Sequence, residues 1–196
     1  DDARAEALSA IIPCLDGQEK EDAIENALIS ASRIQFESAR TMALLDIVPN
    51  LNEKLTEKAL ILASKIKNNY KKVQVLLAIF PKLDGGKNKE VIKNALASAF
   101  QIENDNARAE ALSAIVPHLD GEKKIEVMEK ALDSASLIKD DDARAEALLV
   151  FFPKLVGKMN QKLMEKALTS VHKIKDDLRV KVLSAIVPCL DGQENE

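Results

Sequence analysis

The chain has 196 residues, with 28 Lys and Arg against 32 Asp and Glu, which gives a formal net charge of −4. Hydrophobic residues make up 46% and aromatic residues only 3%, so the chain can bury an aliphatic core and is too apolar to stay disordered. It has no run of about 18 apolar residues and no opening signal peptide, so we expect neither a membrane span nor a leader. The net acidity argues against nucleic-acid binding over the whole surface.

An internal repeat is marked by the prolines. Each follows two apolar residues and precedes a leucine by two positions, and successive prolines are 36, 32, 36, 36 and 35 residues apart: Pro13, Pro49, Pro81, Pro117, Pro153 and Pro188. Five of the six glycines stand four residues after a proline: Gly17, Gly85, Gly121, Gly157 and Gly192. A period of this length is typical of helical-repeat proteins.

The first segment of each repeat predicts an amphipathic helix. In the first repeat, Leu8, Ile11, Ile12 and Leu15 follow the i, i+3, i+4, i+7 spacing of one helix face. The residue five before the proline is always leucine: Leu8, Leu44, Leu76, Leu112, Leu148 and Leu183. We expect the proline to bend the last helical turn and the glycine to cap the helix in a left-handed conformation.

The second segment of each repeat also has helical spacing. Its leucine and its closing isoleucine recur: Leu28, Leu60, Leu96, Leu132, Leu168, and Ile34, Ile66, Ile102, Ile138, Ile174. Both kinds of segment together predict eleven helices. Pro49 stands four residues closer to Ala59 than Pro13 does to Ala27, so the second repeat lacks about one helical turn, in the helix start or its loop.

One such helix pair cannot bury its apolar stripe alone, so we expect the pairs to stack. The predicted fold is an all-α solenoid of antiparallel helix pairs, with about 36 residues per repeat, forming a single domain over residues 1–196. The expected units are residues 1–36, 37–68, 69–104, 105–140 and 141–175, with a terminal half-unit at 176–196. The unpaired last helix, expected at 178–190, means that the array either has an unconventional cap or is cut from a longer solenoid, and the start without Met suits a fragment.

A basic residue stands nine positions before every proline: Arg4, Arg40, Lys72, Arg108, Arg144 and Arg179. A cation near the start of a helix opposes the helix dipole, and the preceding helix ends nearby with unpaired carbonyls. We therefore predict a structural ladder between repeats, in which these side chains cap the carbonyls and pair with acids of the turns. The alternative is a ladder that binds anions.

Three rows of variable residues on the first helices lie outside the leucine stripe. Their middle part is the most apolar, and residues 54–93 add ten lysines against three acids. The candidate interaction surface consists of Met42, Leu45, Gln74, Leu77, Lys82, Lys67, Tyr70 and Lys71. The alternatives are that Leu45, Leu77 and Leu149 pack between helices, and that the lysines form a solvated face.

The sequence contains no arrangement that predicts catalysis, a cofactor or a metal. His118 and His172 lie in different repeats without metal-ligand spacing, and there is no Gly-rich phosphate loop or nucleophile elbow. Cys14 and Cys189 are expected to be small semi-buried residues, too far apart for a disulfide, which suits a reducing cytoplasm.

The assembled repeat resembles the HEAT-like group of helical-repeat solenoids over essentially the whole chain. Asp-Asp-Ala-Arg-Ala-Glu-Ala-Leu, at 1–8 and again at 141–148, looks like the HEAT-type turn acid followed by its Arg-x-x-Ala helix. The Ala-Leu-x-x-Ala-x-x-Ile helix is also similar to the second helix of a tetratricopeptide unit.

The expected function is that of a non-catalytic protein–protein interaction scaffold or recognition module, with a protein or peptide partner of unknown identity. The alternative is a nucleic-acid-binding HEAT-like solenoid that uses the lysine-rich middle units. End-to-end self-association through the terminal helices is a third hypothesis.

Overall fold

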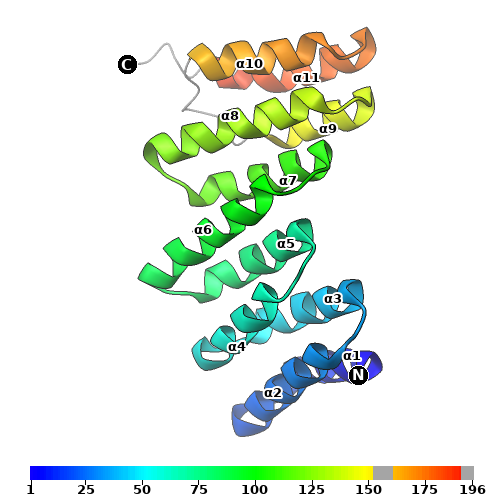
Figure 1. Cartoon of the computed structure of the whole chain (residues 1–196), viewed down its shortest axis with the longest axis vertical. Coiled ribbons are helices and arrows are strands. Elements are labelled where there is room, and N and C mark those ends of the chain that lie inside the picture. Colours follow the sequence, from blue (N-terminus) through cyan, green and yellow to red (C-terminus); the bar gives the residue numbers. More distant parts are fainter. Residues whose placement is uncertain (152–160, 191–196) are drawn as a thin grey trace. The chain divides into compact units, whose positions relative to one another are not determined.

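The computed structural model describes residues 1–151 and 161–190, and their regular structure is entirely helical (Figure 1). These residues contain eleven α-helices, as the segment count predicted, and four short 3-10 turns. Pro153, Leu155, Gly157 and Gly192 lie outside the described residues. The chain divides into two compact units, Asp1–Ser98 and Ala99–Glu196, which are described separately. The single-domain expectation and the repeat boundaries stay predictions.

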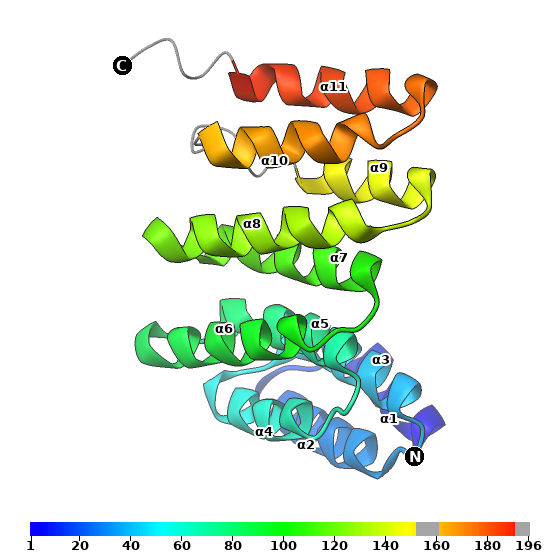
Figure 2. The same cartoon turned by 45° about the horizontal axis from the view of Figure 1, so that its top comes forward.

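Unit 1 contains α1 (Asp2–Ile11), α2 (Gly17–Arg33), α3 (Glu37–Ile47), α4 (Glu53–Ser64), α5 (Asn69–Ile79) and most of α6 (Gly85–Phe100). The first helices of the predicted pairs pack in order, α1 on α3 and α3 on α5. The second helix α2 packs on α4. These contacts place first helices and second helices in two layers within the unit (Figure 2).

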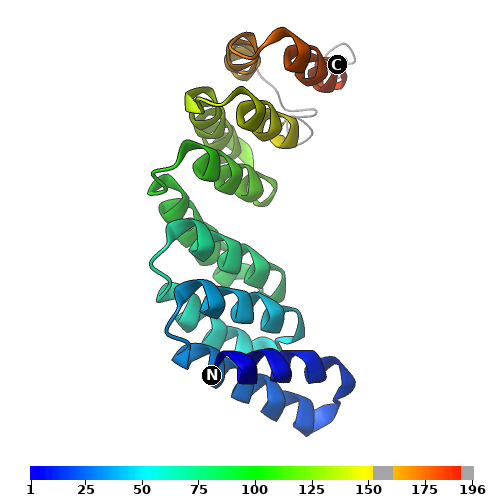
Figure 3. The ribbon, with the colours of Figure 1, turned by 90° about the vertical axis from the view of Figure 1, so that its right-hand side faces the viewer.

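Unit 2 contains α7 (Asp105–Ile115), α8 (Gly121–Leu137), α9 (Asp141–Phe151), α10 (Gln161–His172) and α11 (Asp176–Leu190). Its contacts follow the same order: α7 packs on α9, α9 on α11, and α8 on α10 (Figure 3). The same arrangement of alternate helices therefore occurs in both units.

The prolines tighten the ends of the first helices. In four repeats the α-helix is followed by a 3-10 turn whose second residue is the proline: Ile12–Cys14, Val48–Asn50, Phe80–Lys82 and Val116–His118. Proline has no N–H for the α-helical ladder, so the chain closes the turn with shorter-range bonds, such as Leu15 N to Ile12 O at 3.2 Å.

The predicted role of the glycines was wrong, although their predicted conformation was right. Gly17, Gly85 and Gly121 have φ angles of 53°, 39° and 54°, and each is the first residue of the following helix. Leu15 and Asp16 are extended, with ψ angles of 153° and 166°, and they separate Gly17 from the end of α1. The glycine therefore turns the chain into the second helix and does not cap the first.

The core consists of small and aliphatic residues at equivalent places. The recurring alanines of the second helices are at most 2% exposed, which lets neighbouring helices approach closely: Ala27, Ala59, Ala95, Ala131 and Ala167. The closing isoleucines are all buried. Helix α4 has 12 residues where α2 has 17, and both begin four residues after a proline. The missing turn is therefore lost from the start of α4, which keeps Ala59 buried.

Candidate functional site

The candidate interaction surface includes a row of exposed side chains on the first helices. The residue seven before each proline is exposed in every repeat: Glu6, Met42, Gln74, Glu110, Glu146 and Lys181. Met42 on α3 is 66% exposed. Because α3 packs on α5, Met42 and Gln74 lie on neighbouring helices of unit 1.

Other predicted surface residues are partly occupied by contacts within the protein. Leu45 and Leu77 are half-buried, and so is Leu149, in keeping with the alternative that they pack between helices. The Lys82 ammonium donates a 2.6 Å hydrogen bond to the carbonyl of Pro49. Tyr70 is half-buried as well.

The remaining predicted surface residues are Lys67, in the turn between α4 and α5, and Lys71, in the first turn of α5. Lys71 donates from its ammonium to the Ser38 hydroxyl, while the Lys67 side chain is exposed. Lys71 lies one helical turn before Gln74 on α5, and Ser38 lies one helical turn before Met42 on α3, so this pair continues the row on both helices. Six of the predicted residues therefore lie on α3 and α5, while Lys67 lies in the turn before α5 and Lys82 in the 3-10 turn after it.

Arginines at the ninth position before the proline donate to the carbonyl of the isoleucine that closes the preceding helix. The Arg40 guanidinium lies 3.2 Å from the Ile34 carbonyl oxygen, and that of Arg108 lies 2.7 Å from the Ile102 oxygen. The equivalent distances are 2.9 Å from Arg144 to Ile138 and 3.1 Å from Arg179 to Ile174. Among the side chains that the structure describes, Arg40 also pairs with Glu37, Arg108 with Asp105 and Arg144 with Asp141, in each case the acid three residues earlier.

Arg144 connects two turns of unit 2 through its guanidinium. It is 7% exposed and also donates to the Lys173 carbonyl of the next turn at 2.8 Å. Lys72, which replaces arginine in its repeat, does not donate to the Ile66 carbonyl, and Arg4 is exposed. The planar fork of arginine has several donors, whereas lysine offers a single ammonium.

Sequence reasoning missed a second series of contacts, between lysines and acids on successive second helices. The ammonium belongs to the later helix each time: Glu25–Lys58, Glu57–Lys87, Glu129–Lys162 and Asp133–Lys166. The last two are 2.8 and 2.6 Å long. The partners stand 30 or 33 residues apart. An acid followed by a lysine about one repeat later was the available signal.

Two of these pairs, Glu25–Lys58 and Glu57–Lys87, shift the pKa of their carboxyl groups. The hydrogen bond and then the charge of Lys58 lower the pKa of Glu25, and Lys87 lowers the pKa of Glu57 in the same way. Glu57 raises the pKa of Lys87. Four lysines of residues 54–93 thus have partners within unit 1, namely Lys58, Lys71, Lys82 and Lys87. The lysine-rich segment is therefore not a continuous row of free cations.

Glu37 links two turns of unit 1. Its carboxylate accepts hydrogen bonds from the backbone N–H groups of Lys67 and Asn68, at 2.8 and 2.9 Å. These bonds, that of Lys67 foremost, lower the pKa of Glu37 against the opposing effect of burial. The α2–α3 turn is thereby held against the α4–α5 turn.

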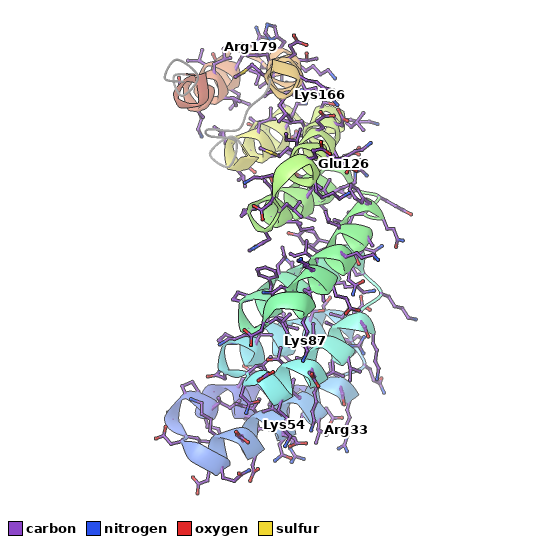
Figure 4. The ribbon with its side chains drawn as sticks, turned by 90° about the vertical axis from the view of Figure 1, so that its left-hand side faces the viewer. Arg33, Lys54, Lys87, Glu126, Lys166 and Arg179 are labelled. Carbon is purple, nitrogen blue, oxygen red and sulfur yellow. The ribbon has the colours of Figure 1, made fainter. Side chains whose placement is uncertain are left out.

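Two open depressions lie between second helices. One, of about 390 Å³, is lined by Glu53, Lys82, Leu83, Asp84, Gly86, Lys87 and Glu90. The other, of about 340 Å³, lies between α8 and α10 and includes the Asp133–Lys166 pair. Both depressions are lined by lysines and acids. Lys87 and Lys166, which are labelled in Figure 4, already have carboxylate partners.

The residues with reactive side chains lie apart. His118 is exposed, and so is His172, whose Nδ1 lies 2.7 Å from the Leu168 carbonyl. Cys14 is exposed rather than semi-buried as predicted, because it ends the surface 3-10 turn. Within residues 1–151 and 161–190, no three His, Cys, Asp or Glu gather as metal ligands. None of the helices described is both long and apolar enough to cross a membrane.

Comparison of the chain with family models, with curated proteins and with solved structures found no match. The HEAT-like resemblance is therefore an expectation from the repeat alone.

Proposed function

We propose that the chain is a non-catalytic scaffold, a HEAT-like α-solenoid, that binds a protein or peptide on the exposed row of its first helices. The observation that carries this proposal is the alternate packing of first and second helices in each unit, with one exposed residue per repeat at the same place. Stacked repeats of this kind offer an extended, modular surface.

The middle of unit 1 is the proposed binding region. Met42 exposes an unbranched apolar side chain, which adapts well to a partner surface, and Gln74 adds hydrogen-bonding groups on the next helix. The exposed free thiol of Cys14 is consistent with a cytoplasmic protein, which we include in the proposal.

A capture experiment tests this proposal. The chain is immobilised and used to collect proteins from a native lysate, beside the variant Met42→Glu/Gln74→Glu. Both positions are exposed, unlike Leu45 and Leu77, where a charge would also disturb packing. We expect a partner that the native chain retains and the variant loses.

A matched control carries Glu122→Gln and Lys130→Gln, two exposed positions on α8. The control should capture the same partner as the native chain. If the Met42→Glu/Gln74→Glu variant also captures it unchanged, the proposed surface is wrong, and if the native chain captures none, the scaffold proposal fails.

A further inference from the structure

The turns after α2 and α4 place an exposed aromatic ring beside cations at one end of unit 1. Phe36 is 80% exposed. The neighbouring cations are also exposed, and in the described part of the chain none of them forms an ion pair: Arg33, Lys65 and Lys67. Both turns lie at the same end of the helices (Figure 1).

Phe36 stands where other turns have a helix-capping residue. The side chains of Asn68, Asn104 and Asp140 each accept a hydrogen bond from the backbone N–H three residues later, at 3.0, 2.9 and 2.8 Å. Phe36 is the N-cap residue of α3 and makes no such bond. Its ring neither caps the helix nor enters the core, so folding stability does not account for it.

The two turns are fixed to each other. The Glu37 carboxylate binds the backbone of Lys67 and Asn68, and Lys71 binds Ser38. The ring and the cations are therefore held together before any partner arrives, which lowers the entropic cost of binding.

Exposed aliphatic side chains border the cations. Ile29 is 43% exposed and Ile61 is 58% exposed, and each stands one turn before a cation on the same helix face, Arg33 and Lys65. We call this surface the Phe36 edge; it consists of Ile29, Arg33, Phe36, Ile61, Lys65 and Lys67.

The positive charge of this edge is not a general feature of the repeat and does not recur at the equivalent residues of a later repeat. Residues 61–72 contain four lysines and no acid. The corresponding residues of a later repeat, 133–144, contain four acids, one lysine and one arginine. The repeat itself therefore does not require the lysines.

We propose that the Phe36 edge binds an acidic protein segment that carries aliphatic or aromatic side chains. This inference rests on the proposed role in protein binding and names the chemistry of the partner. Carboxylates of the segment pair with the free cations, while its apolar side chains cover Phe36 and the two isoleucines. The isoleucines favour a peptide over a nucleic acid, whose bases stack on aromatic rings.

Fluorescence anisotropy tests the proposal with the full chain and a labelled peptide of alternating Asp or Glu and Leu or Phe. Two control peptides replace either every apolar residue by Ser or every acid by its amide. We expect binding of the first peptide only. A labelled single-stranded oligonucleotide is the fourth probe, and its binding in competition with the peptide would overturn the proposal in favour of nucleic acid.

The decisive variant is Phe36→Asn, which removes the ring and supplies the capping residue found at Asn68. Its melting temperature should stay the same or rise, while the peptide binds roughly tenfold more weakly. The double variant Lys65→Glu/Lys67→Glu should weaken binding at least as much. Lys54→Glu, at the opposite end of α4, is the matched control and should leave binding unchanged (Figure 4).

The outcomes separate this inference from the proposed function. Absence of peptide binding, or binding that Phe36→Asn leaves unchanged, overturns the Phe36 edge. Neither result affects capture of a partner through Met42 and Gln74, which is measured independently.

Discussion

Arginine and lysine at the same place in the repeat make different contacts. Arg144 is nearly buried and joins the Ile138 carbonyl, the Lys173 carbonyl and Asp141. Lys72 makes no bond to the Ile66 carbonyl. In contrast, the lysine–acid pairs of the second helices are partly exposed to water, so each adds little to the stability of the fold.

Replacing Arg144 by Lys should lower the free energy of unfolding by about 1–3 kcal/mol, because lysine keeps the charge but leaves buried carbonyls without donors. Urea unfolding measures the change. Arg4→Lys is the matched control, and since Arg4 is exposed it should change stability by less than about 0.5 kcal/mol. Equal effects at the two sites would contradict the bridging role of Arg144.

The lowered pKa of Glu37 predicts a pH-dependent contribution to stability. Because the carboxylate is stabilised in the folded state, its contribution is complete above the unfolded pKa of about 4.3 and is lost as the pH falls through the folded pKa. Glu37→Gln should therefore cost about 1 kcal/mol at neutral pH and progressively less in acid.

Chemical unfolding of both chains between about pH 7 and pH 3 checks this. Glu122→Gln, at an exposed site, serves as the control. A cost of Glu37→Gln that stays constant over this range would rule out the ionised carboxylate as its source.

At the scale of single elements, the turns into α2, α6 and α8 each depend on one backbone conformation, a glycine with a positive φ angle. Gly85 has a φ of 39°, while the next residue, Gly86, is not in the left-handed region. A Cβ at either position would meet no atom within 4 Å. The two glycines therefore differ in backbone conformation and not in available space.

Gly85→Ala should destabilise the chain by about 1–2 kcal/mol, because an L-residue resists the left-handed conformation. Gly86→Ala should stabilise it by about 0.5–1 kcal/mol, because alanine loses less entropy than glycine within a helix. Thermal unfolding should show a lower melting temperature for Gly85→Ala and a higher one for Gly86→Ala than for the native chain. Stabilisation by Gly85→Ala would show that the turn does not need this conformation.

At the scale of the whole molecule, the lysine–acid pairs bear on self-association. In each pair the acid lies on the earlier helix and the lysine on the later one. If a second copy stacked with its α10 against α2, such pairs would form only with lysines at the places equivalent to Lys87, Lys162 and Lys58. Helix α2 has Glu19, Asp22 and Asn26 there.

The 196-residue chain should therefore keep a constant mass in light scattering as its concentration rises. A mass that grows with concentration would contradict this charge argument and favour end-to-end association. The variant Glu19→Lys/Asp22→Lys/Asn26→Lys supplies the missing cations and should associate more readily than the native chain.

The sequence by itself determined the helix count and identified the recurring closing isoleucines, which the structure buries. These follow from local periodicity, because a helix places residues three and four apart on one face. The sequence also placed the missing turn at the start of the second helix of the second repeat or in its loop, because the number of residues between Pro49 and Ala59 can be counted directly.

Only the tertiary structure decided which side chains meet across repeats. The Glu37 bonds to the Lys67 turn, the lysine–acid pairs and the uncapped, exposed Phe36 all depend on how one helix pair lies against the next. The role of Gly17, Gly85 and Gly121 was also decided by the folded backbone, which places each of them at the start of a second helix. The sequence shows which residues flank each glycine, but not that the two residues before Gly17, for example, are extended and separate it from the first helix.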